Sequence, residues 1–145
     1  MQRDSRLNVV WWTLRVGLGL GPFLAGADKF TNLLVNWPMY LNPLATRIVP
    51  VSPQTFMHMV GVVEMVVGLA ILAGWTRWGG YIAMIWLLAI AGNLVVMGRF
   101  FDVAVRDVEI ALSAFALARI SEVLDAAGAK ERRDRAPVVA SPRVA

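Results

Sequence analysis

Hydrophobic positions along the chain gather into four long segments separated by short polar stretches. These segments cover about residues 9–27, 55–73, 80–97 and 103–124. Because a helix rises 1.5 Å per residue, roughly 20 residues cross a hydrocarbon core of about 30 Å. The pattern therefore predicts an all-α fold, a four-helix transmembrane bundle. The third segment carries no charge, whereas the fourth begins with Arg106, Asp107 and Glu109 and is the least apolar.

Turn residues mark where the predicted helices begin and end. Ser52 followed by Pro53 suits a helix start, with a side-chain cap and then a residue that needs no N–H. Gly74 and the pair 79–80 bracket a short turn, which predicts that the second and third helices are antiparallel neighbours. Residues 30–51 contain asparagines, Trp37 and three prolines. We expect this connection to lie in the outer interface or to fold back over the bundle, either as a lid or as a covering.

Basic residues are distributed unevenly over the two sides of the predicted spans. One side has Arg3, Arg6, Arg77, Arg119, Lys130, Arg132, Arg133, Arg135 and Arg143, and the other has Lys29, Arg47, Arg99 and Arg106. The excess of positive charge predicts that both termini are cytoplasmic, and four tryptophans on the same side agree with interfacial placement. Residues 1–125 then form the transmembrane domain, and we expect residues 126–145 to be a disordered basic cytoplasmic tail.

Composition excludes several classes of protein. A hydrophobic content of 58% and a mean hydropathy of +0.61 are typical of a membrane domain. The net charge of +4 does not form a basic helix face with stacking aromatics, so we expect the lipid bilayer and not nucleic acid as partner. The absence of cysteine excludes disulfides, thiolate metal ligands and thiol redox chemistry. Any redox role therefore needs a bound carrier or a partner protein.

Arg15 and Glu64 interrupt apolar segments, where a charge costs roughly 2.5 to 3.5 kcal/mol at mid-helix. At 100° per residue, two helix faces combine charges with small residues: Arg15, Gly19, Pro22, Gly26 and Lys29 on the first helix, and Gly61, Glu64 and Gly68 on the second. We predict an intramembrane ion pair between Arg15 and Glu64. Such a pair either fixes helix packing alone or lines a cavity for a polar or quinone-like head group.

A second polar group falls toward the outer side of the predicted bundle. We expect Lys29, His58, Asn93 and Glu109 to form a candidate pocket there. No metal site is predicted, because the single histidine has neither a second histidine nor a carboxylate at helical spacing. Asp28 and Asp107 are interpreted as helix-end charges that reach water. No nucleotide-binding or hydrolase motif occurs, because the glycine run 17–21 lies inside an apolar span.

Three stretches carry a family pattern: Arg15 with the glycine run 17–21, then Pro22-Phe-Leu-Ala-Gly-Ala-Asp-Lys-Phe30, then Gly61-Val-Val-Glu64 to Arg77. In these stretches the chain resembles the DoxX family of small four-helix bacterial membrane proteins. The resemblance covers about residues 14–118, and the first three helices match best. Residues 100–107 depart from the family's usual Lys-Asn pair before the last helix.

The resemblance implies a multi-pass component of a redox or quinone-linked system in a bacterial plasma (inner) membrane. It also implies quinone as a candidate cofactor and a membrane redox protein or a second copy of the chain as partner. Arg15, Lys29 and Glu64 match the family's polar positions, without a catalytic assignment. Two other classes stay open, a non-catalytic scaffold or assembly factor and a small-solute carrier, and so does the question whether the chain is an enzyme.

Overall fold

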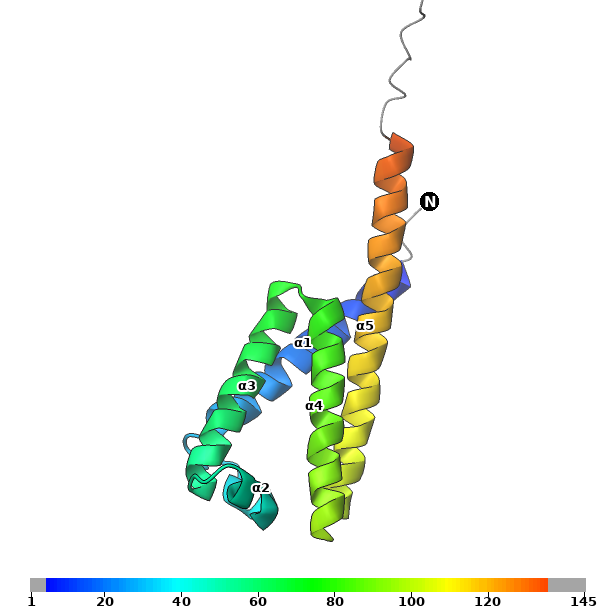
Figure 1. The fold of residues 1–145 in the computed structure, drawn as a ribbon. Coiled ribbons are helices and arrows are strands. Elements are labelled where there is room, and N and C mark those ends of the chain that lie inside the picture. Colours follow the sequence, from blue (N-terminus) through cyan, green and yellow to red (C-terminus); the bar gives the residue numbers. More distant parts are fainter. Residues whose placement is uncertain (1–4, 136–145) are drawn as a thin grey trace, which may run out of the picture.

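The chain is helical throughout the part that the computed structural model describes, residues 5–135 (Figure 1). Its four long helices are α1 (Ser5–Asp28), α3 (Pro53–Ala73), α4 (Thr76–Met97) and α5 (Phe101–Arg135). Between α1 and α3 lie the short helices η1 (Trp37–Tyr40) and α2 (Pro43–Ile48). No strand occurs within residues 5–135, which confirms the all-α prediction.

Three of the long helices are long and apolar enough to cross a membrane. They are α1 from Arg6 onward, α3 and α4. α5 contains the fourth predicted segment but does not have this character, because only nine consecutive residues between Glu109 and Arg119 are free of charge. Length alone would allow α5 to cross, since its 35 residues extend about 50 Å at the helical rise.

The end of α5 differs from the sequence-based expectation. Residues 126–135 continue the helix, so the predicted disordered tail is wrong for this part, and residues 136–145 lie outside the described residues. The physical reason is that Ala, Lys, Glu and Arg are strong helix formers. An ion pair between Arg135 and Glu131 at 2.6 Å also links successive turns. This last part of α5 projects past the α3–α4 turn in Figure 1.

α1 and α3 pack closely because glycines on each helix face the other. A Cβ atom placed on Gly26 would lie 2.5 Å from the carbonyl oxygen of Gly61, and one on Gly68 would lie 2.5 Å from that of Gly19. Real side chains cannot approach backbone this closely, so only glycine permits the contact. The two faces that the sequence predicted to be small therefore do meet.

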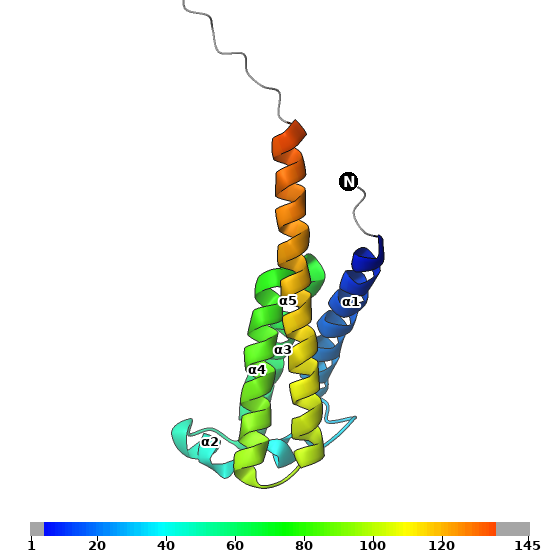
Figure 2. The ribbon, with the colours of Figure 1, turned by 90° about the vertical axis from the view of Figure 1, so that its right-hand side faces the viewer.

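The second helix pair is α4 with α5, and small residues again set its spacing. A Cβ on Gly80 would lie 2.8 Å from the carbonyl oxygen of Ala114. The two pairs share a core cluster that includes Leu18, Ile71 and Leu117. Figure 2 shows that the beginning of α1 and the end of α5 lie at the same end of the molecule. In Figure 1, α3 and α4 are close at the turn that joins them and diverge toward the end where α2 lies.

Most local signals position the connections as the sequence indicated, but Gly79 and Gly80 lie inside α4 and the turn after Gly74 is shorter than predicted. The Ser52 side chain accepts a hydrogen bond from the N–H of Thr55 at the start of α3. Gly74 ends α3 in the left-handed conformation, with φ of 108°, which favours glycine. The long connection folds back onto α4, where the Asn93 side chain donates to the Tyr40 carbonyl at 2.9 Å and accepts from the Asn42 N–H at 3.3 Å.

A glycine substitution tests the backbone contact between α1 and α3. We expect Gly68→Ala to lower the free energy of unfolding in detergent by about 1 to 3 kcal/mol, because the added methyl group overpacks the helix contact. Gly17→Ala is the matched control, because a Cβ at Gly17 meets nothing within 4 Å. The control should leave stability unchanged or raise it by up to about 1 kcal/mol through helix propensity. Equal stabilities of the two variants would contradict this packing.

Candidate functional site

A buried ion pair joins α3 to the end of α1. The Lys29 ammonium lies 2.5 Å from Oε2 of Glu64, and the two side chains are only 4% and 10% exposed. The glycine contact brings them together, because a Cβ on Gly61 would lie 3.2 Å from that of Lys29. The Lys29 ammonium also donates to the Ala25 carbonyl at 3.5 Å, one turn back along α1. The lysine side chain therefore folds toward the middle of the bundle.

The predicted ion pair between Arg15 and Glu64 is wrong. Arg15 instead donates from Nε to the Ile71 carbonyl at 3.2 Å and from Nη2 to the Leu72 carbonyl at 2.5 Å, which satisfies the last turn of α3. Side chains on a helix point toward its N-terminus, so Arg15 leans away from Glu64 while Lys29 leans toward it. The Arg15 guanidinium lies 5.0 Å from the ring centre of Trp11 and 4.7 Å from that of Trp12.

Asp28 organises the loop that follows α1. Its carboxylate accepts hydrogen bonds from the backbone N–H groups of Leu33 and Leu34, from the Thr31 hydroxyl and from Nε1 of Trp37 at 2.8 Å. The side chain is buried, so its interpretation as a helix-end charge reaching water is wrong. A carboxylate can accept several bonds at once, which is why one residue suffices to fix this loop.

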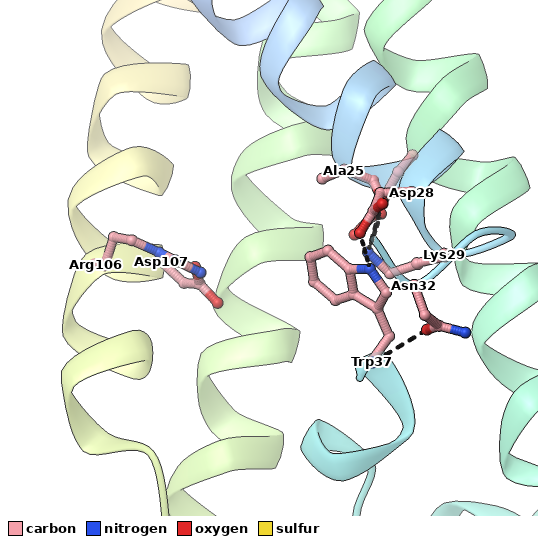
Figure 3. A network of polar contacts seen from close by, with 8 residues as sticks. Ala25, Asp28, Lys29, Asn32, Trp37, Arg106 and Asp107 are labelled. Carbon is pink, nitrogen blue, oxygen red and sulfur yellow. Dashed lines mark hydrogen bonds and ion pairs between the residues drawn. The ribbon is translucent and has the colours of Figure 1, made fainter. Parts of the chain in front are cut away.

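The Asp28 bond places the Trp37 indole directly over Lys29 (Figure 3). The lysine Nζ lies 3.7 Å from the ring centre, a cation–π contact. The connection between α1 and α3 therefore covers the ion pair with an aromatic side chain. The sequence predicted that this connection acts either as a lid or as a covering. Both roles agree with a loop that contacts the buried charge.

Asp107 brings a third charge to this region from α5. It is 4% exposed and paired with Arg106 at 3.1 Å, and it interacts electrostatically with Lys29 and with Glu64. Figure 3 shows Asp107 projecting from α5 toward the side where Lys29 and Trp37 lie. Its interpretation as a solvated helix-end charge is therefore wrong. One feature of the sequence did indicate burial of Asp107, namely its position on a helix face of small residues: Ala104, Ala111, Ala114 and Ala118.

Trp86 supplies a buried donor next to the same carboxylate. Its indole, on α4, has a buried Nε1 that faces the Glu64 carboxylate closely enough to interact with it, although the contact falls short of hydrogen-bond geometry. Buried donors without acceptors are rare in folded proteins and call for an explanation. We define Lys29, Trp37, Glu64, Trp86 and Asp107 together as the Lys29 site.

The predicted four-residue pocket divides between separate places. His58 adjoins Lys29 through Gln54, whose Nε2 lies 2.8 Å from the His58 ring nitrogen and 3.1 Å from the Lys29 carbonyl. Asn93 instead holds the loop against α4. Glu109 is exposed and lines a cavity of about 260 Å³ with apolar residues. Because Glu109 is two residues from Asp107, it lies on nearly the opposite side of α5 and cannot share the pocket.

The Lys29 site combines complementary chemical groups in a buried volume. Lys29 and Trp86 are donors, two carboxylates can accept and exchange protons, and Trp37 presents an aromatic face. In the described part of the chain, no three His, Asp or Glu side chains are placed to hold a metal ion. Comparison of the chain with known protein families, curated proteins and solved structures gives no match.

A double-mutant cycle tests the assignment of partners. We expect Lys29→Met and Glu64→Gln to be coupled by at least about 1 kcal/mol in the free energy of unfolding, because each single change strands the other group in the core. Arg15→Met and Glu64→Gln should be additive within about 0.5 kcal/mol. Detergent-solubilised protein titrated with denaturant provides the measurement. Strong coupling of Arg15 to Glu64, with additivity at Lys29, would reverse the assignment.

Proposed function

We propose that the protein is a multi-pass membrane protein whose four long helices all cross a bacterial plasma membrane, with both termini cytoplasmic. Three apolar helices support this placement, and an even number of crossings agrees with the beginning of α1 and the end of α5 lying at one end of the molecule (Figure 2). Two ion pairs reduce the cost of charge on α5 in a fourth crossing. Asp107 pairs with Arg106, and Arg119 pairs with Glu122.

We propose further that the chain is a DoxX-like component of a quinone-linked redox system and binds a quinone head group at the Lys29 site. The observation that carries this proposal is the buried Nε1 of Trp86, a donor that faces the Glu64 carboxylate of the Lys29–Glu64 pair without completing a well-formed hydrogen bond to it. Lys29 and Trp86 suit the two carbonyl oxygens of a quinone ring, and the indole of Trp37 suits its flat face.

A bound quinone supplies two-electron, two-proton redox chemistry. The chain's own contribution is to bind, orient and exchange protons. Glu64 and Asp107 are the two carboxylates placed to hold a proton. The positive charge of Lys29 stabilises the ionised form of either carboxylate after the proton has left. Because the sequence has no cysteine, the electrons must come from a partner protein in the membrane. This division of roles makes the chain a subunit that binds the carrier.

A second candidate function is a non-catalytic scaffold or assembly factor. The observation in its favour is that Lys29 and Glu64 close on each other at 2.5 Å beneath Trp37. Neither residue lines the cavities of about 720 and 260 Å³. A closed pair explains its own burial through packing, without a ligand. Binding measurements on a variant that leaves this pair intact separate the two functions.

Single cysteines test the membrane topology, because the natural chain has none. In intact cells, an impermeant maleimide should label Ile48→Cys and Arg99→Cys, whereas Ala73→Cys and Ala129→Cys should react only after the membrane is permeabilised. The expected pattern follows from four crossings with cytoplasmic ends. Labelling of Arg99→Cys and Ala129→Cys from the same side would show that α5 does not cross.

Trp86→Phe tests quinone binding without disturbing the ion pair. A short-chain benzoquinone should quench tryptophan fluorescence of the purified full-length protein saturably, and this variant should weaken the affinity by about tenfold through loss of one hydrogen bond to a buried oxygen. The Lys29–Glu64 pair remains in this variant, and because the smaller ring leaves space between the helices, the melting temperature is measured alongside to verify folding. Trp78→Phe, at an exposed position near the other end of the bundle, is matched in chromophore number and should bind normally.

Two outcomes contradict the quinone proposal. Equal weakening in the two variants would indicate partitioning of quinone into the detergent, with no defined site. Absence of saturable quenching and of co-extracted quinone, together with recovery of a stable membrane complex, would instead identify the scaffold function.

A further inference from the structure

We propose that a second site, at the end of the molecule where α5 projects, binds the head group of an ethanolamine phospholipid. A cavity of about 720 Å³ lies there between the beginning of α1, the α3–α4 turn and α5. It is lined by Asn8, Trp11, Trp12, Gly74, Trp75, Thr76, Arg77, Trp78, Ser121, Leu124, Asp125, Gly128 and Arg132. None of these residues belongs to the Lys29 site, so the inference is independent of the redox proposal.

The cavity lies at the depth of lipid head groups when α3 and α4 span the bilayer. It surrounds the turn between the two most apolar helices, which end and begin at Ala73 and Thr76. Three of its indoles are largely exposed, with Trp12 at 53%, Trp75 at 73% and Trp78 at 63%. Tryptophans with this exposure concentrate where the hydrocarbon region meets the head groups. A ligand here is therefore approached from the membrane surface.

A buried chain of hydrogen bonds fixes the walls of the cavity. Nε1 of Trp11 donates to the Ser121 hydroxyl at 2.9 Å, and Ser121 lies 2.8 Å from the hydroxyl of Thr76. Ser121 and Thr76 are both 3% exposed. Because these three residues belong to α1, α5 and α4, the elements around the cavity are held together before any ligand arrives. Such preorganisation lowers the entropy cost of binding.

Two guanidinium groups on the cavity wall can contact a phosphodiester, and Arg132 is the one with nitrogens free of described partners. Arg132 donates only from Nε, to the Gly128 carbonyl at 3.4 Å, so its terminal nitrogens have no described partner. Arg77 contacts Glu122 through Nε at 3.2 Å. Trp75, the N-cap residue of α4, provides no side-chain cap, so the first N–H groups of α4 add donors near the guanidinium groups. Guanidinium nitrogens match phosphate oxygens in number and geometry.

Asp125 indicates which head group accompanies the phosphate. Its carboxylate is exposed in the cavity and forms no hydrogen bond or ion pair with another described residue. A primary ammonium, with three donors, satisfies this carboxylate. A glycerol head group would leave the aspartate without a counter-charge beside the phosphate, and a serine head group would add a second carboxylate. The charges in the cavity therefore favour a phosphate and an ammonium on the same ligand.

Choline is a weaker match because it needs free aromatic faces. A quaternary ammonium is recognised by a cage of rings. Three of the four indoles already face a cation: Arg15 lies over Trp11 and Trp12, and Arg77 lies 5.2 Å from the ring centre of Trp78. Only Trp75 has no cation over it in the described structure. Ethanolamine, which binds through hydrogen bonds to a carboxylate, is therefore favoured over choline.

Native mass spectrometry of the full-length protein released from bilayer discs tests this inference. The discs contain equal parts of phospholipids with ethanolamine, glycerol and choline head groups. We expect one ethanolamine lipid to be retained about tenfold more often than either competitor, because each charge-assisted hydrogen bond adds discrimination. Equal retention of the three lipids would overturn the proposal. Displacement of the lipid by millimolar inorganic phosphate or phosphoethanolamine would also overturn it, in favour of a soluble ligand.

Variants on the surface of α5 assign the two halves of the head group. Asp125→Asn should remove the preference for ethanolamine over glycerol, and Arg132→Gln should lower retention of all three lipids by about tenfold. Asp134→Asn and Arg133→Gln are matched controls, because both residues are exposed on the same helix and do not line the cavity. All four substitutions are at exposed positions, and melting temperatures verify folding. If the control variants lowered retention as much as the cavity variants, general surface charge would explain the binding and the site would be excluded.

Discussion

The backbone contact between α1 and α3 sets the positions of Lys29, Glu64 and Arg15. Gly26 lies against Gly61 and Gly19 against Gly68. Backbone atoms of the two helices are in direct contact at these positions, and this contact fixes how far one helix is shifted along the other. This register carries Lys29 to Glu64 and Arg15 to the carbonyl groups that end α3. Each cation thus meets an acceptor that would otherwise be left unsatisfied in an apolar region. The same small residues therefore determine both the spacing of the two helices and the partners of their charged side chains.

Residue periodicity was sufficient to predict the helices and the faces through which α1 and α3 meet. The same periodicity gave the wrong partner for Glu64, because position on a helix face does not include the tilt of side chains toward the N-terminus. Arg15 and Lys29 are both on the correct face, and only the direction of their long side chains distinguishes them. The helices could be predicted from the apolar pattern, whereas the ion pair required side-chain geometry.

Local sequence signals could not predict the structure of the loop after α1 or the burial of Asp107, for different reasons. Asp28 is fixed by bonds from Leu33, Leu34 and Trp37, and these depend on the path of a connection that has no periodic pattern. Asp107 is buried because α5 turns its face of small residues toward the other helices. Because Asp107 is close in sequence to Glu109, the sequence alone predicts that Asp107 is solvated as well. Tertiary packing overrides that interpretation.

The distance in sequence between Lys29 and Glu64 also constrains how the chain enters a membrane. Glu64 follows its partner by 35 residues, and it reaches the bilayer only when α3 is synthesised. A carboxylate in the middle of an isolated helix opposes insertion by roughly 2.5 to 3.5 kcal/mol. In the proposed membrane placement, Lys29 offsets this cost, so α3 inserts more favourably beside α1 than alone. The ion pair therefore affects membrane insertion of the two helices as well as the folded structure.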